Sequence, residues 1–442
     1  MIVNFLKESF DDLKAQTKNN PAFISIVLVL ISIQNAIIIN NISILILIII
    51  AAICFKKNHF HVNTILLLPI LLYGLMVLSF LWTIDHPRTA SAILKELPLI
   101  IIPACFLVSK PFSDAQKQKI IQYYGYAMVL FSVFYLIKAL SRYLISYDST
   151  VFFYHELVTK EINAIHVSVY VAIAFFYFFI KPIKKTIDYA VLILLLTMVF
   201  LLSSLNIIMV FIGLIIAYHL FYSKLSKKMR LKNLLIVVSV LLLVPFSSKI
   251  KERFQQEYET IMVDNSVNDV ISKNGEVVYN VSIKKAWTTD RFQPNNYFPG
   301  TAFRVYQFRV FLELLKENNI FWQGFGLDAS YKKIEEKGVY HNVYLGHDTK
   351  NLEGYQKKNF HNQYVQNFAE LGVFGFLLLI LMLLVNLKNG FKTKNFIHIS
   401  FAILMISLFL TETFLWRQRG VMFFTIMYCI FNSKSFKSIS NE

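Results

Sequence analysis

Residues 42–55 read ISILILIIIAAICF and are followed directly by Lys56 and Lys57. The run carries no charged residue, and it belongs to a stretch that can cross the roughly 30 Å hydrocarbon core of a bilayer as a helix. Residues 26–33 and 192–202 are continuous or nearly continuous apolar runs of the same kind. These runs predict an integral membrane protein rather than a soluble domain.

The composition of the whole chain agrees with this interpretation. Of its 442 residues, 56% are hydrophobic and only 16% are charged, and the mean hydropathy is +0.53. Water-soluble chains carry about 25% charged residues, so this chain has too few charges to cover the surface of a soluble globule. Much of the net charge of +17 lies in short clusters between apolar runs, where it orients a membrane protein. No nucleic-acid partner is expected.

The three cysteines, Cys54, Cys105 and Cys429, all fall in predicted spans. They are expected to pack as small apolar residues and not to form a disulfide or a thiolate metal site. The first 20 residues mix charged and polar side chains, without a cleavage site after a short apolar core. No cleavable signal peptide is therefore expected, and the first span would act as the insertion signal.

The apolar runs predict an all-α polytopic membrane protein with about twelve spans, counted in windows of about 20 residues. The predicted spans are 22–40, 42–55, 64–83, 92–108, 119–141, 165–180, 187–203, 205–222, 231–247, 364–387, 396–413 and 418–432. The first two are joined by a tight turn at Asn40-Asn41, so they are expected to form a helical hairpin.

The connections between spans alternate between many and few positive charges. The rich connections hold Lys56 and Lys57; Lys110, Lys117 and Lys119; Lys181, Lys184 and Lys185; Lys224, Lys227, Lys228, Arg230 and Lys232; and Lys388, Lys392 and Lys394. The other short connections hold only Arg88, Arg142, Lys160, Arg417 and Arg419. Because positively charged loops stay on the cytoplasmic side, the chain is predicted to lie in the cell inner membrane with both termini in the cytoplasm.

One long polar excursion interrupts the spans, and the charge bias places it in the periplasm. The predicted organisation is a membrane domain of about nine spans at 1–247, a periplasmic loop domain at 248–363 and a membrane domain of about three spans at 364–442. The excursion is too long to be a mere linker and too polar to enter lipid.

Within this loop, residues 304–318 (RVYQFRVFLELLKEN) predict an amphipathic helix. The residues of its apolar face recur at helical spacing and are Phe308, Phe311, Leu312 and Leu315. Gln307, Arg309 and Lys316 are expected on other faces.

The loop ends in FHNQYVQNFAELGVFG, residues 360–375, which opens a membrane helix. His361 is therefore expected at the outer membrane face, where the head group of a lipid-anchored substrate lies. Histidine suits a general base there, because its unperturbed pKa of about 6.5 leaves the neutral imidazole available near pH 7. The competing interpretation is a polar interfacial residue that caps the helix. Gly372 and Gly375 are expected to permit a close helix–helix approach.

The order His361-Asn362, nine further residues and Gly372-x-x-Gly375 resembles the signature of the O-antigen ligase/O-antigen polymerase superfamily. Members carry, further upstream, an arginine followed four positions later by an aromatic residue, an amphipathic helix and a Gly-x-Gly. The similar residues here are Arg304, Phe308 and Gly324-Phe325-Gly326. Downstream, residues 412–424 (ETFLWRQRGVMFF) are similar to the Glu…Arg-Gln-x-Gly segment of Bacteroidetes-type members. The layout of spans is similar over most of the chain, and the resemblance implies a GT-C-like fold with a large periplasmic loop.

The chain departs from the family pattern in two regions. Asn319 stands where a proline is common, and two residues are inserted before Gly324. Members often place an arginine or lysine after the serines at the outer end of an earlier span, whereas Ser203-Ser204-Leu205-Asn206 offers only Asn206. The candidates for a replacement cation are Arg309, Arg417 and Arg419. A second pair, His341-Asn342, lacks the following Gly-x-x-Gly helix and ranks below His361.

The resemblance implies a donor glycan on undecaprenyl pyrophosphate and an acceptor hydroxyl, carried by lipid A-core for a ligase or by another repeat unit for a polymerase. His361 is the expected base. The residues expected to bind the pyrophosphate are Arg304, Arg417 and Arg419, because a planar guanidinium matches phosphate oxygens. The expected supporting residues are Asn362, Glu412, Gly372 and Gly375. The outer loops lack clustered carboxylates and tight metal-ligand spacing, so catalysis is expected to need no metal and no cofactor.

Other interpretations stay open. Arg304 could be a solvated residue on an exposed helix face, and Arg417 and Arg419 could contact lipid headgroups. A transporter or flippase of lipid-linked oligosaccharides is the competing class, and it should show repeat symmetry and charges within its spans. A membrane scaffold or receptor is the third class, and it would not need Arg304 together with His361. The motifs do not separate a ligase from a polymerase, and membrane lipids are expected partners in every case.

Overall fold

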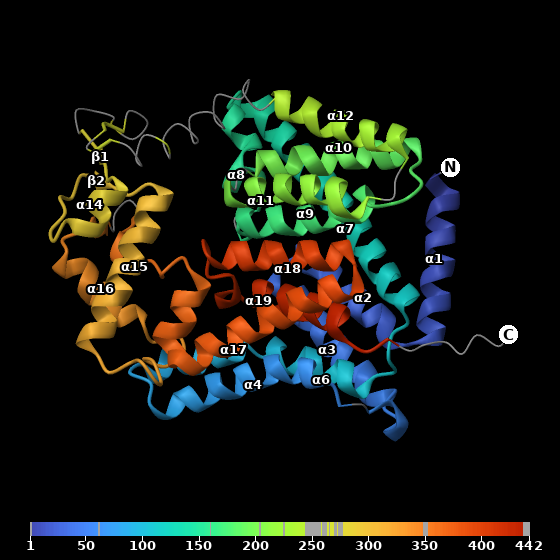
Figure 1. The fold of residues 1–442 in the computed structure, drawn as a ribbon, viewed down its shortest axis with the longest axis horizontal. Helices are drawn as coiled ribbons and strands as arrows, with labels where there is room; N and C mark the ends of the chain where they lie inside the picture. The colour runs from blue at the N-terminus through green and yellow to red at the C-terminus, as the bar shows by residue number, and fades with distance from the viewer. Residues whose placement is uncertain are drawn as a thin grey trace.

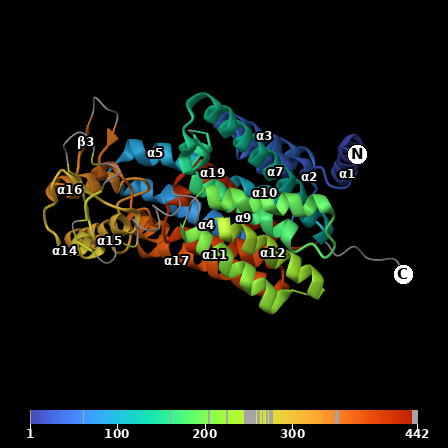
Figure 2. The same cartoon turned by 90° about the horizontal axis from the view of Figure 1, so that it is seen from above.

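The computed structural model describes residues 2–60, 62–159, 161–202, 205–223, 226–243, 258, 263–264, 266–268, 272, 277–347 and 352–435. These residues are mostly helical, as expected of an all-α polytopic membrane protein (Figure 1). Several helices, among them α4, α9, α17 and α18, run along the long axis of the molecule, and α14, α15 and α16 lie together beyond one end of them (Figures 1 and 2).

The elements up to residue 243 are α1 (Ile2–Asn19), α2 (Ala22–Ser32), α3 (Ile37–Ile53), η1 (Lys57–His59), α4 (Thr64–Leu78), η2 (Ser79–Leu81), α5 (His86–Lys95), α6 (Pro98–Val108), α7 (Asp114–Ser146), η3 (Ser149–Phe152), α8 (Tyr154–Leu157), α9 (Ala164–Phe179), α10 (Thr186–Leu201), α11 (Leu205–Ala217), η4 (Tyr218–Tyr222) and α12 (Lys227–Leu243). The later elements are β1 (Tyr279–Asn280), α14 (Ile283–Thr288), β2 (Asn296–Tyr297), α15 (Gly300–Glu317), α16 (Tyr331–Tyr340), β3 (Gly346–His347), β4 (Leu352–Glu353), η7 (Tyr355–Lys357), α17 (Gln363–Thr393), α18 (Phe396–Phe409), η8 (Phe414–Trp416) and α19 (Gln418–Asn432). The strands pair only as β1 with β2 in parallel and β3 with β4 antiparallel.

Each of the predicted spans overlaps a helix of the structure. Among the described residues, 5 helices are long and apolar enough to cross a membrane: Thr64–Leu81, His86–Val108, Asp114–Ser146, Leu205–Tyr222 and Gln363–Thr393. Shorter apolar helices are Ala22–Ser32, Ile37–Ile53, Ala164–Phe179, Thr186–Leu201 and Phe396–Phe409. Helix formation satisfies the backbone groups that hydrocarbon leaves without partners. The polytopic membrane class predicted from the sequence is confirmed.

The first helical hairpin is also present, but its turn was predicted at the wrong place. Helix α2 ends at Ser32 and α3 begins at Ile37, and the two helices pack together. Asn40 lies inside α3, fully buried, and its side-chain amide donates to the carbonyl of Ser32. A polar residue that suggested a turn is therefore accommodated in a helix, because the end of the neighbouring helix supplies an acceptor for it.

The interior of the bundle is built around α9 and α19, which are buried on nearly every side. The two helices meet through an aromatic pair: Tyr170 of α9 and Phe423 of α19 lie 4.4 Å apart between ring centroids. Other helices expose apolar side chains outward, such as Leu71 of α4 and Leu130 of α7. A helix that is apolar all round belongs in a protein core or in lipid, so this exposed apolar surface is the part that contacts the bilayer.

Helices α14–α16 belong to a second apolar core, separate from that of the bundle. Its largest rings include Phe298, Phe303 and Tyr306, which pack edge-on or tilted around the inner face of α15. The amphipathic helix was predicted correctly, but two of its residues were assigned to the wrong face. Gln307 is fully buried, whereas Phe308 is 43% exposed. Helical spacing alone could not show that α14 leaves Phe308 at the surface.

A short segment, residues 321–328, fastens this outer part to the bundle. The backbone N–H groups of Phe325 and Gly326 donate to the carbonyls of Ala369 and Glu370 in α17, at 2.8 and 2.9 Å. On its other side, Thr89 of α5 donates to the carbonyl of Leu327 at 2.6 Å. The segment therefore lies between α17 and the α4–α5 region and is hydrogen-bonded to both.

Gly372 makes this attachment possible by breaking α17. Its φ of 64° and ψ of −164° interrupt the helix, and the N–H of Val373 is free to donate to the carbonyl of Phe321 at 2.8 Å. A Cβ at position 372 would overlap the backbone of Trp322. The predicted helix–helix approach at Gly372 is thus wrong, because a loop backbone is what comes close. Next to Gly375, the nearest atoms belong to Leu371 of the same helix.

Candidate active site

Three segments that are distant in the sequence bring Arg304, His361 and Glu412 together. Arg304, on α15, donates from Nε to the carbonyl of Thr411 at 2.9 Å and from Nη2 to Oε1 of Glu412 at 3.3 Å. Nδ1 of His361 lies 3.8 Å from Oε2 of the same carboxylate. Glu412 therefore stands between a guanidinium and an imidazole, and each of its oxygens faces one of them.

The carboxylate of Glu412 is almost fully buried, at 7% exposure, in the connection between α18 and α19. Burial alone would raise its pKa, but His361 and Arg304 outweigh burial and hold the pKa of Glu412 below its usual range. An opposite charge at this distance favours the ionised form. Glu412 is therefore an anion that is paired on both sides.

His361 is presented by the chain just before α17, and its backbone conformation is unusual. Its φ is 47°, in the left-handed region, and its N–H donates to Oδ1 of Asn359 at 3.0 Å. Asn359 in turn donates to Oγ1 of Thr413 at 2.7 Å. A residue of this type rarely adopts such a backbone without a surrounding structure that requires it. The turn aims the imidazole at the Glu412 loop.

The neighbour of His361 is the residue that caps α17. Oδ1 of Asn362 accepts from the N–H groups of Tyr364 and Val365 at 3.0 and 3.1 Å. Its amide nitrogen donates to the carbonyl of Leu410 at 3.2 Å. Asn362 therefore satisfies the helix start and ties it to the end of α18, while the side chain of His361 takes no part in the cap.

The side chains of Arg304 and His361 are accessible to solvent, in contrast to that of Glu412. The side chains of Arg304 and His361 are each 29% exposed. Phe303 packs edge-on against the imidazole, with ring centroids 5.4 Å apart, and so restricts its orientation. An approaching ligand would meet the imidazole and the guanidinium before it met the carboxylate.

Asn206 occupies the position where a cation was thought to be missing. Its amide nitrogen donates to the carbonyl of Ser407 at 2.8 Å and to Oγ1 of Thr411 at 3.0 Å. The hydroxyl of Ser407 donates back to Oδ1 of Asn206 at 2.7 Å. Asn206 thus fastens α11 to the end of α18, next to the carbonyl that Arg304 contacts, and adds no positive charge there.

The other arginines proposed as replacement cations do not join this group. Arg419 is 8% exposed and donates to the carbonyls of Glu161 and Asn35 at 2.7 and 2.9 Å. These partners belong to the segment before α9 and to the α2–α3 turn, so Arg419 ties α19 to both of them. Arg417 is exposed at the start of α19.

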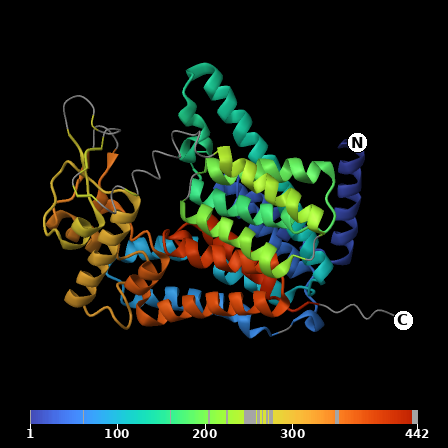
Figure 3. The same cartoon turned by 45° about the horizontal axis from the view of Figure 1, so that its top comes forward.

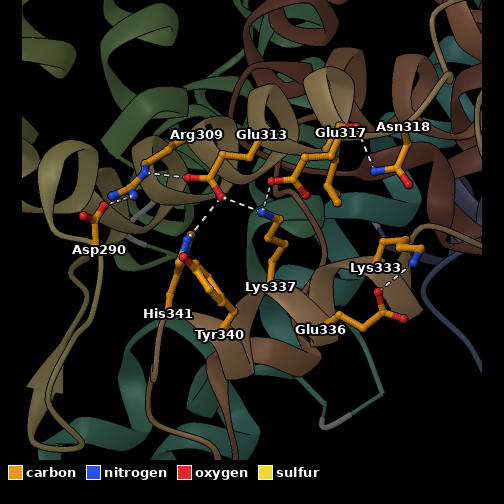
Figure 4. Close-up of a pocket in the computed structure, with 11 residues that line it drawn as sticks. Asp290, Arg309, Glu313, Glu317, Asn318, Lys333, Glu336, Lys337, Tyr340 and His341 are labelled. Carbon is orange, nitrogen blue, oxygen red and sulfur yellow. Dashed lines mark hydrogen bonds and ion pairs between the residues drawn. The ribbon is translucent and has the colours of Figure 1, made fainter.

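Arg309 belongs to a charged pocket between α15 and α16, shown in Figure 4. Its guanidinium contacts Glu313 at 2.8 Å and Asp290 at 3.1 Å. In the same pocket, the buried imidazole of His341 lies 3.2 Å from Glu313 through Nε2 and 3.2 Å from the hydroxyl of Tyr306 through Nδ1. Burial lowers the pKa of His341, although Glu313 opposes this. The pocket links the two helices, and it leaves His341 buried among partners of its own.

A further buried polar group lies where the loop meets the bundle, at residues that no sequence motif singled out. Asp328 is 3% exposed, accepts from the indole N–H of Trp416 at 2.7 Å and lies 3.7 Å from Arg88. Burial raises the pKa of Asp328 against the effects of Trp416 and Arg88. Asp328, Trp416 and Arg88 are far apart in the sequence. Only their contacts in the structure show that they attach the loop to the connection between α18 and α19.

Within the ranges that the structure describes, no three His, Cys, Asp or Glu side chains are grouped so that they could hold a metal ion. The carboxylate nearest His361 is Glu412, which the arginine already engages.

Comparison with known proteins identifies the central part of the chain. Residues 189–380 match the family model described as O-antigen ligase. The match begins in α10 and ends within α17, so it includes Arg304 and His361 and stops before Glu412. The chain matches none of the curated proteins with which it was compared.

Proposed function

We propose that this chain, whose residues 189–380 match the O-antigen ligase family model, transfers a glycan from undecaprenyl pyrophosphate to the hydroxyl group of an acceptor. The family supports a membrane glycosyltransferase that uses a lipid-linked glycan donor. The single observation that carries the finer proposal is the convergence of His361, Glu412 and Arg304 at an accessible position.

The proposed reaction exchanges one bond at the anomeric carbon and moves one proton. The acceptor oxygen bonds to the anomeric carbon of the donor sugar, the bond from that carbon to the pyrophosphate oxygen breaks, and the hydroxyl proton passes to His361. Since Nδ1 of His361 faces Glu412, Nε2 is the atom that takes the proton. A positioned base of this kind contributes roughly 10²–10⁴-fold to a rate.

Glu412 acts as a positioning residue in this proposal. Its negative charge orients the imidazole and stabilises the imidazolium that forms when the proton is taken, the role that a buried carboxylate plays beside a catalytic histidine. The other oxygen of Glu412 holds Arg304 by Nη2. The structure describes no hydrogen bond from Nη1 of Arg304 to any of the described residues, so this nitrogen can donate to the departing pyrophosphate.

The proposed topology has twelve spans, both termini in the cytoplasm and residues 248–363 in the periplasm. Two observations support it. Helices α14–α16 lie beyond one end of the bundle and α1 lies at the other (Figure 1). The lysine-rich connections listed above alternate with the poor ones, as the positive-inside rule requires. The proposed domain division at 1–247, 248–363 and 364–442 follows from the same arrangement.

The acceptor is proposed to be lipid A-core, which makes the protein a ligase; the alternative is a polymerase that joins repeat units. Deleting the gene and separating the surface glycolipids on a gel distinguishes the two. A band of core alone supports the ligase, and core plus a single repeat supports the polymerase. An unchanged glycan ladder in the deletion strain would contradict both.

Catalysis is proposed to need no metal ion. Purified protein in lipid nanodiscs, supplied with the lipid-linked donor and the acceptor, should transfer the glycan at the same rate with and without EDTA. Loss of transfer on chelation, with recovery when one divalent cation is restored, would show that the charge of the leaving pyrophosphate is neutralised by a metal rather than by arginine.

A further inference from the structure

A groove of about 650 Å³ separates α14 from α15 next to the candidate active site. Ile283 and Trp287 of α14 line one side, and Val305 and Phe308 of α15 line the other. Arg304 lies at the edge of the same groove. Lys284 and Thr301 also line the groove, so its walls are mostly but not wholly apolar, and the guanidinium that contacts Glu412 forms one boundary.

Two aromatic rings dominate the surface of this groove. Trp287 is 45% exposed and Phe308 is 43% exposed. Their planes are inclined by only 24°, with centroids 6.3 Å apart, so the two rings stack on each other and both leave aromatic surface exposed in the groove. Phe308 follows Arg304 by four positions on α15, which puts the two side chains on one side of the helix. A large exposed aromatic face beside a charged group is typical of a binding site.

We propose that this groove is a saccharide subsite in which a sugar ring of the donor glycan packs against the exposed aromatic surface of Trp287 and Phe308. The inference rests on the proposed function, since it names where the transferred glycan lies. A pyranose has an apolar C–H face and a polar rim of hydroxyl groups. The C–H face packs against the electron-rich face of an aromatic ring, while the hydroxyl groups stay in water at the open side of the groove.

The order of the parts along the molecule favours a sugar over the lipid tail. The end of α18 leads to Thr411 and Glu412, these contact Arg304, and the groove continues from Arg304 away from the bundle. Figures 1 and 3 show α14 and α15 beyond the ends of α17 and α18. A lipid-linked donor has the same order of tail, pyrophosphate and sugar. With its pyrophosphate at Arg304, its tail lies along the bundle helices and its sugar reaches the aromatic face.

The kinetic test uses purified protein in nanodiscs and varies the concentration of the lipid-linked donor. Trp287→Ala and Phe308→Ala should each raise KM for the donor about tenfold, the loss expected for one well-placed aromatic contact, with little change in kcat. Trp287→Phe should retain most of the affinity, because it keeps an aromatic face. Trp322→Ala is the control: Trp322 is 61% exposed, packs against Phe321 and does not line the groove.

A second experiment measures binding of the saccharide alone, independently of the transfer reaction. The probe is the soluble oligosaccharide released from the host's own surface glycolipid, and the readout is the tryptophan fluorescence that differs between wild type and Trp287→Phe. Saturable quenching that depends on Trp287 supports the subsite. If wild type binds the oligosaccharide in this way but transfers no glycan, the subsite stands and only the proposed reaction fails. Quenching by undecaprenyl phosphate but not by the oligosaccharide would assign the groove to lipid and overturn the proposal. Absence of any Trp287-dependent signal, with an unchanged KM in both alanine variants, would overturn it as well.

Discussion

A carboxylate oxygen of Glu412 lies 3.3 Å from Nη2 of Arg304, although 108 positions separate the two residues in the sequence. The other oxygen of Glu412 lies 3.8 Å from Nδ1 of His361. Because α15, the turn before α17 and the connection after α18 each supply one member, the group forms only when the outer helices are docked on the bundle. The three residues have different proposed roles, so substitutions at each of them should change a different measured property.

Replacing His361 with Ala should lower kcat by roughly 10²–10⁴-fold, the usual contribution of a positioned base. Protein abundance should stay unchanged, since the side chain is part-exposed and takes no part in the cap of α17. The measurement is transfer by purified variants at equal concentration. Lys358→Ala serves as a control, because Lys358 is close in sequence and its exposed amine pairs with Glu353. A wild-type glycan ladder from the His361 variant would refute its role as base.

Replacing Arg304 with Lys should keep the positive charge and still lower kcat/KM by roughly tenfold to a hundredfold, the loss expected for a hydrogen bond to a charged group. One ammonium cannot reproduce the separate contacts that Nε and Nη2 make with Thr411 and Glu412. The matched control is Arg309→Lys on the same helix, where the guanidinium pairs with Asp290 and Glu313 outside the site. Equal activity in the two variants would mean that Arg304 is only a solvated surface residue.

The ionisation of Glu412 should make the stability of the site depend on pH in a defined direction. Its folded-state pKa lies below the ordinary 4.5, so the folded protein binds fewer protons than the unfolded chain does. The stabilisation is then complete above about pH 4.5 and is lost as the pH falls through the folded-state value. The difference in Tm between wild type and Glu412→Gln should therefore narrow as the pH falls below about 4.5.

The control for this measurement is Glu336→Gln, which changes an exposed carboxylate paired with Lys333. Its melting temperatures should follow those of wild type at every pH. A gap between wild type and Glu412→Gln that widened in acid would have the opposite sign, and it would show that burial, rather than Arg304 and His361, decides the charge of Glu412.

Replacing Gly372 with Ala should destabilise the junction between the outer helices and the bundle. The residue has a φ of 64° and a ψ of −164°, and a Cβ there would overlap the carbonyl of Trp322. Strain of this kind costs about 1–3 kcal/mol, which thermal unfolding in nanodiscs should record as a lower Tm. Gly213→Ala in α11 is the control, since nothing lies within 4 Å of the added atom. Equal melting temperatures for both variants would rule out a constrained contact at Gly372.

The helices of the bundle could be predicted from the sequence because the requirement for crossing lipid is local. A run such as residues 42–55 must be helical wherever it lies in the bundle, since hydrocarbon provides no partner for an open backbone group. Prediction failed where one residue's environment is set by a distant one. Asn40 indicated a turn, but the carbonyl of Ser32 accepts its amide within a helical hairpin. Gln307 and Phe308 exchanged their expected exposures, because the elements packed against α15, and not its own spacing, decide which of its faces is covered.

For the site, the order of short motifs singled out His361, Arg304 and Glu412 one at a time, and distance in space decided the rest. The same reasoning proposed Arg419 beside them, yet its two terminal nitrogens donate to the carbonyls of Glu161 and Asn35. It also gave Gly372 a helix as neighbour, where the backbone of Trp322 is the group that approaches.

The sequence alone determined that this is a helical membrane protein with a polar excursion before its last spans, because apolar length and charge clusters act on the bilayer without reference to the rest of the fold. It also identified which residue types could perform base and phosphate chemistry. Only the tertiary structure decided that Glu412 lies between Arg304 and His361 and that Trp287 and Phe308 border the same arginine. Those relationships depend on the contact between residues 321–328 and α17 where Gly372 interrupts that helix. Local sequence does not encode this packing contact.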